Sequence, residues 1–186
     1  MFKKTLLCGA LAFTVIAPEV GLAAQVKHTN STAQSAAKDT AITAKVKALF
    51  AKSSLIKGRD ISVVTVNRKV ILSGTVDTDL QYERAIVLAG SVDDVRDVDA
   101  DTLIVKSSES PMADTYITAK VKGRLLKEKI FGDKDIEYWP VSVETKNGIV
   151  YLAGSVETAK QRSNIVNLVK GVKGVKSVKS SLSVKD

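Results

Sequence analysis

Hydrophobic and polar positions alternate along this chain with two different periods, and the same succession of periods occurs twice. Residues 42–50 carry Ile, Val, Leu and Phe at positions i, i+4, i+7 and i+8. That spacing predicts one apolar face of an amphipathic helix. Residues 117–125 repeat most of the stripe with Ile, Val and Leu. The sequence therefore predicts a helix at the start of each of two similar segments.

Two runs of β-branched residues follow each of these predicted helices and indicate a β-hairpin. The runs are 61–66 with 70–73, and 141–145 with 149–152. The second hairpin turns at Asn147-Gly148, the dipeptide that a tight two-residue turn prefers. The first turns at Asn67-Arg68, where a residue with a Cβ makes positive φ less favourable.

Each hairpin is followed by a second apolar stripe and a last strand. Apolar residues at i, i+3, i+4 and i+7 begin at Ala85 in the first copy and at Ile165 in the second. In the second copy, residues 178–184 then show the alternating pattern of side chains that is typical of a strand. A strand, a helix and a further strand favour a parallel strand pair. We therefore expect an α+β fold of two tandem α-β-β-α-β modules, each a three-stranded mixed sheet covered by two helices.

The repeat is also visible residue by residue. The blocks 39–47 and 70–76 return as 114–122 and 150–156. We expect a first domain over 39–106, a linker over 107–113 and a second domain over 114–186. Asp39 and Asp114 precede the stripes and are expected to cap the helices. Gly74 and Gly154 recur at a strand exit, where a tight bend or a close backbone approach is expected.

The N-terminal region has the order of a secretory signal. Lys3 and Lys4 precede an apolar core over 5–17 and a stretch of small residues before Gln25, so residues 1–24 are expected to be a signal peptide. Cys8 has a poor lipoprotein context because most of the apolar run follows it. Residues 25–38 are small and polar without a hydrophobic period, and are expected to form a flexible tether. The protein is therefore expected to be periplasmic after signal-peptide cleavage.

Three motifs together resemble the BON domain family. They are the helix Ile-Thr-Ala-Lys-Val-Lys, the strand Leu-Ser-Gly-Thr-Val or Leu-Ala-Gly-Ser-Val, and the segment 172–178. The resemblance covers about residues 40–186. It implies a bacterial envelope protein that is associated with stress and contacts phospholipid membranes. In the first copy, residues 90–95 depart from the glycine and basic spacing of the second, which makes the second copy the better candidate for membrane contact.

Charge separates the two copies. Residues 39–106 hold 10 basic and 10 acidic residues, net 0, whereas residues 114–186 hold 14 basic and 8 acidic, net +6, of a chain total of +8. Solubility alone does not require such an asymmetry. The residues expected to bind phospholipid are basic side chains of the second copy and one indole that could insert among headgroups: Lys120, Lys122, Arg124, Lys127, Trp139, Lys170, Lys173, Lys176 and Lys179. A solvated basic face without a ligand, and a Trp139 packed on its own sheet, remain open alternatives.

Other chemistries fit the sequence poorly. Asp97, Asp99 and Asp101 alternate, but the glycine and glutamate of a calcium loop are missing, so the alternation is interpreted as the outer face of a strand. One histidine, His28, and no cysteine beyond Cys8 leave no catalytic triad. No phosphate-binding glycine loop is present. We expect a protein that is not an enzyme and has no cofactor, no metal and no nucleic-acid partner.

Three functions remain. The first is peripheral binding to anionic phospholipid membranes through the second module. The second is a periplasmic chaperone or interaction module for exported client proteins. The third is a purely structural pair in which the acidic edge of the first copy docks on the basic edge of the second. The sequence does not give the lipid, the client, the orientation of the two domains or the oligomeric state.

Overall fold

The computed structural model describes residues 22–108, 112–132, 134 and 139–185. The chain divides into two units, residues 1–34 and 35–186, and only the second contains strands among the described residues. Of the expected signal peptide, residues 1–21 lie outside the described residues. The rest of this section concerns the second unit, together with the helix that leads into it.

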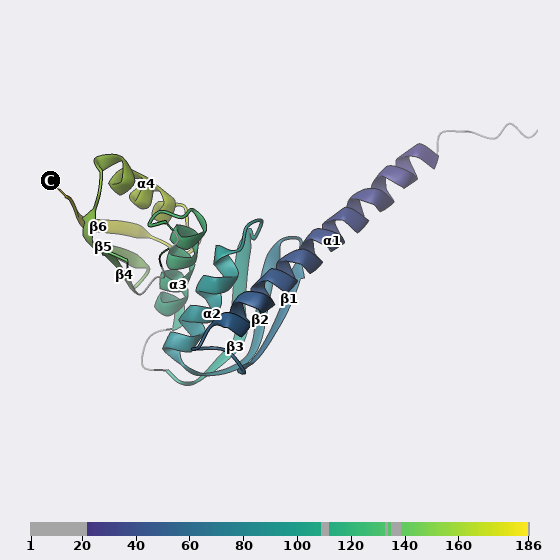
Figure 1. Cartoon of the computed structure of the whole chain (residues 1–186), viewed down its shortest axis with the longest axis horizontal. Helices are drawn as coiled ribbons and strands as arrows, with labels where there is room; N and C mark the ends of the chain where they lie inside the picture. The colour runs from purple at the N-terminus through teal and green to yellow at the C-terminus, as the bar shows by residue number, and fades with distance from the viewer. Residues whose placement is uncertain (1–21, 109–111, 133, 135–138, 186) are drawn as a thin grey trace, which may run out of the picture. The chain divides into compact units, whose positions relative to one another are not determined.

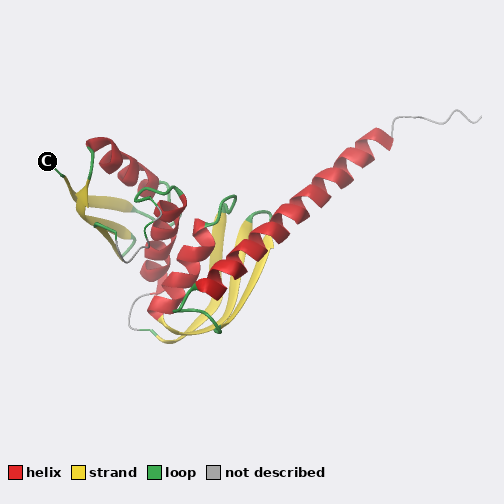
Figure 2. Cartoon of the chain, viewed as in Figure 1, coloured by secondary structure: helices red, strands yellow, loops and turns green. Residues whose placement is uncertain are grey.

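The first module contains α1 (Leu22–Lys52), β1 (Asp60–Val66), β2 (Lys69–Thr78), α2 (Asp79–Ser91) and β3 (Asp97–Ser107). The second contains α3 (Met112–Lys127), β4 (Val141–Lys146), β5 (Ile149–Val156), α4 (Ala159–Lys170) and β6 (Ser177–Val184). Figures 1 and 2 show the same order of helices and strands in both. The expected α-β-β-α-β modules are confirmed.

Each sheet is three-stranded and mixed, as the connections predicted. β1 pairs antiparallel with β2 and β2 parallel with β3, and β4, β5 and β6 repeat this arrangement. Val63 lies opposite Leu72, and Val143 lies opposite Leu152, so the repeated apolar residues occupy the same face of each sheet. The helices cover that face and leave the other face of each sheet open.

Two hydrophobic cores result, one in each module. Ile42, Val46 and Phe50 of α1 are buried in the first, and Ile117, Val121 and Leu125 of α3 are buried in the second. The amphipathic stripes seen in the sequence are therefore the core faces of these helices.

The expected flexible tether is helical in the structure. Residues 25–38 belong to α1, which runs without a break from Leu22 to Lys52. No glycine or proline interrupts this segment, and alanine, glutamine and lysine are good helix formers. Once Ile42, Val46 and Phe50 fix the C-terminal half against the module, extending the helix costs little because nucleation has already occurred. The absence of a hydrophobic period therefore did not indicate a break in the helix.

The repeated aspartates do not cap helices, which corrects the sequence prediction. The Asp39 carboxylate accepts hydrogen bonds from the backbone N–H groups of Asn67 and Arg68, at 2.7 and 2.8 Å. Asp114 accepts from Asn147 and Gly148 at the same distances. Each carboxylate thus joins the first helix of a module to the turn of its hairpin.

The repeated strand glycines mark a close backbone approach, as expected. Gly74 and Gly154 have φ of 114° and 123°. A Cβ at Gly74 would lie 2.0 Å from the carbonyl oxygen of Asp60, and one at Gly154 would lie 2.1 Å from that of Pro140. Only glycine fits such a contact at positive φ, so both residues allow the hairpin strands to meet.

The second helix of each module begins with a capping motif that sequence analysis missed. Thr78 accepts a hydrogen bond from the N–H of Gln81, and Thr158 accepts one from the N–H of Gln161. Each glutamine side chain in turn accepts from the backbone N–H of the residue before the cap. The Thr-x-x-Gln spacing of a capping box was visible in both copies.

Candidate functional site

The helix α3 is the element around which the candidate site is built, because it contacts both modules. One face buries Ile117, Val121 and Leu125 in the second core, and another places Ala119 in the first core. α3 lies beside α2 (Figure 1), and Gly123 approaches the backbone of Val87 so closely that a Cβ would lie 3.2 Å from its carbonyl oxygen. Small residues on this face of α3 therefore let the two modules meet.

Three of the predicted lipid-binding lysines are engaged in this contact between modules. Lys120 Nζ pairs with the Asp97 carboxylate at 2.5 Å, and its side chain is only 10% exposed. Lys122 Nζ pairs with Glu83 at 2.6 Å. Lys127 Nζ donates to the backbone carbonyl of Val95, in the first module, at 2.8 Å. The Tyr116 hydroxyl also donates to the carbonyl of Val98. These lysines are thus engaged between the modules and do not form a free basic face.

This arrangement matches the third hypothesis in part, since an acidic edge of the first module meets basic residues of the second. Oppositely charged side chains that pair across a packed contact favour one alignment of the two surfaces. The contact accounts for three lysines of α3, but it leaves the lysines at and beyond the end of α4 without a role.

Those remaining lysines form an exposed group, here called the free lysine cluster and defined as Lys170, Lys173 and Lys176. All three are exposed, and no residue within the described ranges forms an ion pair with them. When the two modules are aligned on their shared Thr-x-x-Gln motif, these lysines correspond to Gly90, Asp93 and Arg96 of the first module. The cluster carries +3 where the first module carries no net charge.

The other three predicted residues lie elsewhere. Arg124 is exposed on α3 and pairs with Glu128 at 3.3 Å. Lys179 lies on the open face of the second sheet with its Nζ 5.4 Å from the centre of the Tyr151 ring. Trp139 packs against the second core, stacks at a tilt on Phe131 at 4.9 Å, and donates its indole N–H to the carbonyl of Lys134. The side chain of Trp139 therefore has the packing role that the sequence left open.

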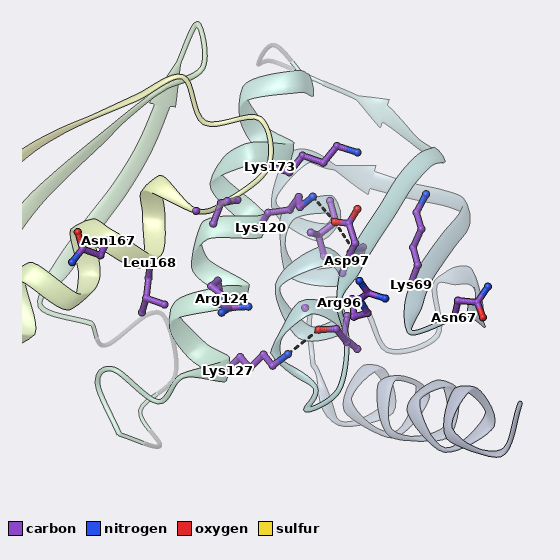
Figure 3. Close-up of a pocket in the computed structure, with 16 residues that line it drawn as sticks. Asn67, Lys69, Arg96, Asp97, Lys120, Arg124, Lys127, Asn167, Leu168 and Lys173 are labelled. Atoms are coloured by element: carbon purple, nitrogen blue, oxygen red, sulfur yellow. Dashed lines mark hydrogen bonds and ion pairs between the residues drawn. The ribbon is translucent and has the colours of Figure 1, made fainter. Parts of the chain in front are cut away.

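A groove of about 570 Å³ lies along α3 where the two modules meet (Figure 3). It brings together six cationic side chains from both modules and one carboxylate, that of Asp97. The cations are Lys69, Arg96, Lys120, Arg124, Lys127 and Lys173. Sequence reasoning missed this groove because its walls come from separate segments spread between residues 67 and 173, and only the packing of α3 joins them.

Ion pairs shift the pKa values of charged groups in the first sheet. A hydrogen bond from Lys69 at 2.5 Å holds the pKa of the Asp99 carboxyl below its usual value, and the same bond raises the pKa of Lys69. Burial raises the pKa of Tyr82 to about 12 and raises that of Tyr116 as well. All of these groups keep their usual charge at neutral pH. The positive charge of Lys69 is therefore balanced by the negative charge of Asp99.

The alternating aspartates lie on a strand, as interpreted from the sequence. Asp97 begins β3 and pairs with Lys120, while Asp99 pairs with Lys69. An irregularity in the β2–β3 register lets Asp101 donate its N–H to the Asp99 carboxylate. Within the part of the chain that the structure describes, no group of three or more metal-ligating side chains was found, and no helix has the length and hydrophobicity to span a bilayer.

The comparisons with known proteins agree with the repeat. A family model described as the BON domain matches residues 38–107 and again 113–186. The chain is 38% identical over 128 residues to osmotically-inducible protein Y of Escherichia coli (strain K12), an overlap of 66% of this chain and 61% of that protein. The chain thus matches less than two thirds of the length of this relative.

Solved structures with partial similarity include two of CdsD, a structural protein of the type III secretion system of Chlamydia trachomatis. One is described as its C-terminal domain, is 19% identical and covers 80% of this chain and 67% of that chain, with a TM-score of 0.32. The other is 18% identical, covers 79% and 63%, and also has a TM-score of 0.32. Scores this low support no argument about this protein.

Proposed function

The chain belongs to the BON domain family, and we propose that it is a non-enzymatic protein of the bacterial envelope that acts in osmotic stress and binds anionic phospholipid surfaces through its second module. The envelope location rests on the signal-like N-terminus and on the family, and the osmotic role on the similarity to osmotically-inducible protein Y. In this proposal the protein is exported to the periplasm and binds the membrane peripherally.

The observation that carries the proposal is the free lysine cluster. The two modules share one fold, so the first module is an internal control for what the fold itself requires. At the positions of Lys170, Lys173 and Lys176 the first module has no net charge, and the fold still forms. The lysines are therefore not needed for folding, and their lack of ion-pair partners among the described residues leaves their charge available to a ligand.

The expected affinity is low. Each Lys near an anionic membrane surface contributes about 1 kcal/mol, so the three lysines and Lys179 together supply roughly 3–4 kcal/mol. That corresponds to a dissociation constant of about a millimolar or weaker. Since Lys120, Lys122 and Lys127 are engaged between the modules and Trp139 is packed, the additional affinity must come from other groups.

The experiment is co-sedimentation with vesicles of phosphatidylglycerol and phosphatidylethanolamine, compared with vesicles of phosphatidylcholine alone. The unaltered protein should sediment with the anionic vesicles, and less of it should do so as salt is raised, because salt screens exposed charges. The combined change Lys170→Gln, Lys173→Gln and Lys176→Gln should remove most of this binding.

A matched control removes the same charge from the first module. Lys45, Lys47 and Lys52 are exposed on α1, and changing all three to Gln lowers the net charge by the same amount. This control should sediment like the unaltered protein. Equal loss in both variants, or equal binding to neutral vesicles, would contradict the proposal. Reversing Lys120, Lys122 and Lys127 is not a suitable test, because it would also break the contact between modules.

A second candidate function, binding of exported client proteins, is favoured by the open face of the first sheet. Val64 is 51% exposed on β1 and Ile104 is 63% exposed on β3. Val64 lies opposite Ile71 in the register of the sheet, so apolar groups adjoin on this face. Hydrophobic client binding should persist as salt is raised, whereas lipid binding through lysines should not. The same co-sedimentation series, repeated with an unfolded client in place of vesicles, separates the two functions.

A further inference from the structure

The groove along α3 has a charge that its own contacts do not neutralise. Of its six cations, Lys120 is paired with Asp97, Lys69 with Asp99 and Arg124 with Glu128. The remaining three are Arg96, Lys127 and Lys173, of which Lys127 donates only to a neutral carbonyl. No described residue forms an ion pair with the side chain of Arg96 or Lys173. Three positive charges therefore share one cavity without matching carboxylates.

We propose that this groove is a binding site for a phosphate ester, held by Arg96 and Arg124 with Lys127 and Lys173 at its sides. Figure 3 shows Arg124 and Lys127 projecting from α3, and Arg96 beside the pair formed by Lys120 and Asp97. The site is formed only when the two modules are packed together, because Arg96 belongs to the first module and the other three to the second. It gives the junction between modules a role that neither module has alone.

The surroundings strengthen the attraction for an anion. Ile86, Val98, Leu168 and Val172 contribute apolar surface to the groove. Charges beside apolar walls interact more strongly than charges in open water, since less solvent screens them. An anion bound among the three unneutralised cations would supply the negative charge that the groove lacks.

The ligand class follows from charge and size. A phosphate monoester carries about −1.5 to −2 charges at neutral pH and offers three acceptor oxygens. The planar guanidinium of arginine matches such oxygens with two parallel hydrogen bonds. The Arg124–Glu128 pair is exposed and spaced i, i+4, so exchanging it for a ligand costs little. A cavity of about 570 Å³ accommodates a headgroup-sized molecule.

The end of α4 also constrains the position of the anion. Asn167 and Gly171, which lie at the C-terminal end of this helix, are part of the groove wall. The carbonyl groups at a helix C-terminus carry partial negative charge and repel an anion. The phosphate is therefore expected against the opposite wall, where α3 contributes Arg124 and the start of β3 is preceded by Arg96.

This inference rests on the proposed function and deepens it, because an anionic lipid headgroup also presents a phosphate ester, there as a diester with a single negative charge. It can hold for a free phosphate ester even if the membrane proposal fails. Two probes distinguish the sources: soluble glycerol 1-phosphate, and vesicles containing phosphatidylglycerol. Binding of the soluble probe tests the groove alone, whereas vesicle binding also requires the free lysine cluster.

The experiment is calorimetric titration of the full chain with glycerol 1-phosphate, with sodium sulfate as a competing simple anion. The unaltered protein should bind the ester. The double variant Arg96→Gln and Arg124→Gln should bind about tenfold more weakly or worse, because each arginine contributes charge-assisted hydrogen bonds. Both side chains are exposed, so the variant should keep its fold, which circular dichroism verifies. The control Lys45→Gln and Lys47→Gln removes the same charge from α1 and should bind normally.

A second measurement uses the unaltered protein. In an NMR titration with glycerol 1-phosphate, the backbone amide signals of Arg96, Arg124 and Lys173 should shift together, whereas those of Lys45 and Lys47 should not. The inference is overturned if the ester does not bind at millimolar concentration or if sulfate displaces it with equal affinity. Equal weakening in the two double variants, or shifts spread over the whole chain, would also overturn it.

The two proposals fail in different ways. The variant Lys170→Gln and Lys176→Gln leaves the groove intact and should lose vesicle binding while retaining the soluble ester. Ester binding without any vesicle binding by the unaltered protein would refute the membrane proposal and support the groove. Vesicle binding that depends on these lysines, without ester binding, would refute the groove and support the membrane proposal.

Discussion

At the scale of single residues, the two repeated aspartates show how one side chain can fix a turn far away in the sequence. Asp39 and Asp114 each accept two backbone N–H groups from the hairpin turn of their module. The turn residues Asn67 and Arg68 have φ of 50° and 66°, which exposes their N–H groups to the helix. The sequence correctly indicated a structural role for these aspartates but assigned them the wrong partners.

Arg68 has the positive φ that was expected to make this turn less favourable, and the structure shows a compensating contact. The Arg68 guanidinium pairs with the Asp94 carboxylate at 3.0 Å and also donates to the carbonyl of Asp94 at 2.8 Å. Asp94 itself has a φ of 70°. The second module has Gly148 and Gly174 at the corresponding positions, both with positive φ. The first module thus uses an ion pair where the second uses two glycines.

Replacing either repeated aspartate should destabilise its module. We expect Asp39→Ala and Asp114→Ala each to lower the free energy of unfolding by about 1.5–3 kcal/mol, since two hydrogen bonds to a charged acceptor are lost. Urea unfolding measures this loss. Asp93→Ala, at an exposed position just after α2, is the control and should change stability by less than about 0.5 kcal/mol. Equal effects at Asp93 and Asp39 would contradict this account of the turn.

At the scale of secondary-structure elements, α3 decides how the chain is organised. Its strongest apolar stripe, Ile117, Val121 and Leu125, belongs to the second core. The opposite contact is closest at Ala119 and Gly123, whose small side chains carry almost no hydrophobic signal, and three larger α3 side chains pack on the first core around them: Met112, Tyr116 and Leu126. Small residues permit close approach of two helices, so the contact with α2 depends on shape as well as on apolar packing and ion pairs.

Enlarging the small face of α3 should therefore separate it from α2. In Gly123→Leu, the new side chain would meet the Val87 backbone, where even a Cβ lies 3.2 Å from the carbonyl oxygen. We expect a loss of about 1–3 kcal/mol in the free energy of unfolding, the usual cost of overpacking. Thermal unfolding should then show two transitions in place of one. Ala48→Leu places the same side chain at an exposed position on α1 and should leave a single transition at an unchanged temperature.

At the scale of the whole molecule, charge is arranged so that part is neutralised internally and part remains free. The second module holds net +6 and the first net 0. Lys120 and Lys122 use carboxylates of the first module, whereas Lys170, Lys173 and Lys176 have no described ion-pair partner. Carboxylates held by lysine and arginine recur on or next to the sheets, at Asp77, Asp99 and Glu157. Folding stability should consequently depend on pH at the acid end.

The pH dependence follows from the direction of the shifts. A hydrogen bond from Lys106 lowers the pKa of Asp77, one from Lys69 lowers that of Asp99, and one from Lys185 lowers that of Glu157. A carboxyl whose pKa is lower in the folded state stabilises the fold above its unfolded pKa of about 4, and this stabilisation is lost as pH falls through the folded value. The free energy of unfolding should fall below about pH 4.

Urea unfolding at pH 7, 5, 4 and 3 measures this decline. Asp99→Asn should be less stable than the unaltered protein at pH 7 and should lose less on acidification, because one titrating carboxyl is gone. The raised pKa of Lys69 predicts the opposite dependence in alkali, where its stabilisation is present below pH 10.5 and lost at higher pH. Stability that rises as pH falls from 5 to 3 would contradict both assignments.

Much of the fold was determined by the sequence itself. The spacing of Ile42, Val46 and Phe50 predicted a core helix, the Asn147-Gly148 pair predicted a hairpin turn, and the repetition of both predicted two copies of one module. These signals are local, because the period of a helix or strand and the φ preference of a turn residue involve only neighbours along the chain. Family membership followed from the same short blocks.

The candidate site was decided only by tertiary structure. The sequence identified the basic character of the second module, but it could not distinguish Lys120, which is paired across the junction, from Lys173, which is exposed at the groove. The partner of each lysine lies in another element, and which carboxylate comes within reach depends on how α3 packs on α2. The groove exists for the same reason, since the packing of Gly123 on Val87 brings charges of both modules together. A periodic pattern indicates which face of a helix is buried. The role of a charged side chain, in contrast, depends on the groups that folding places around it.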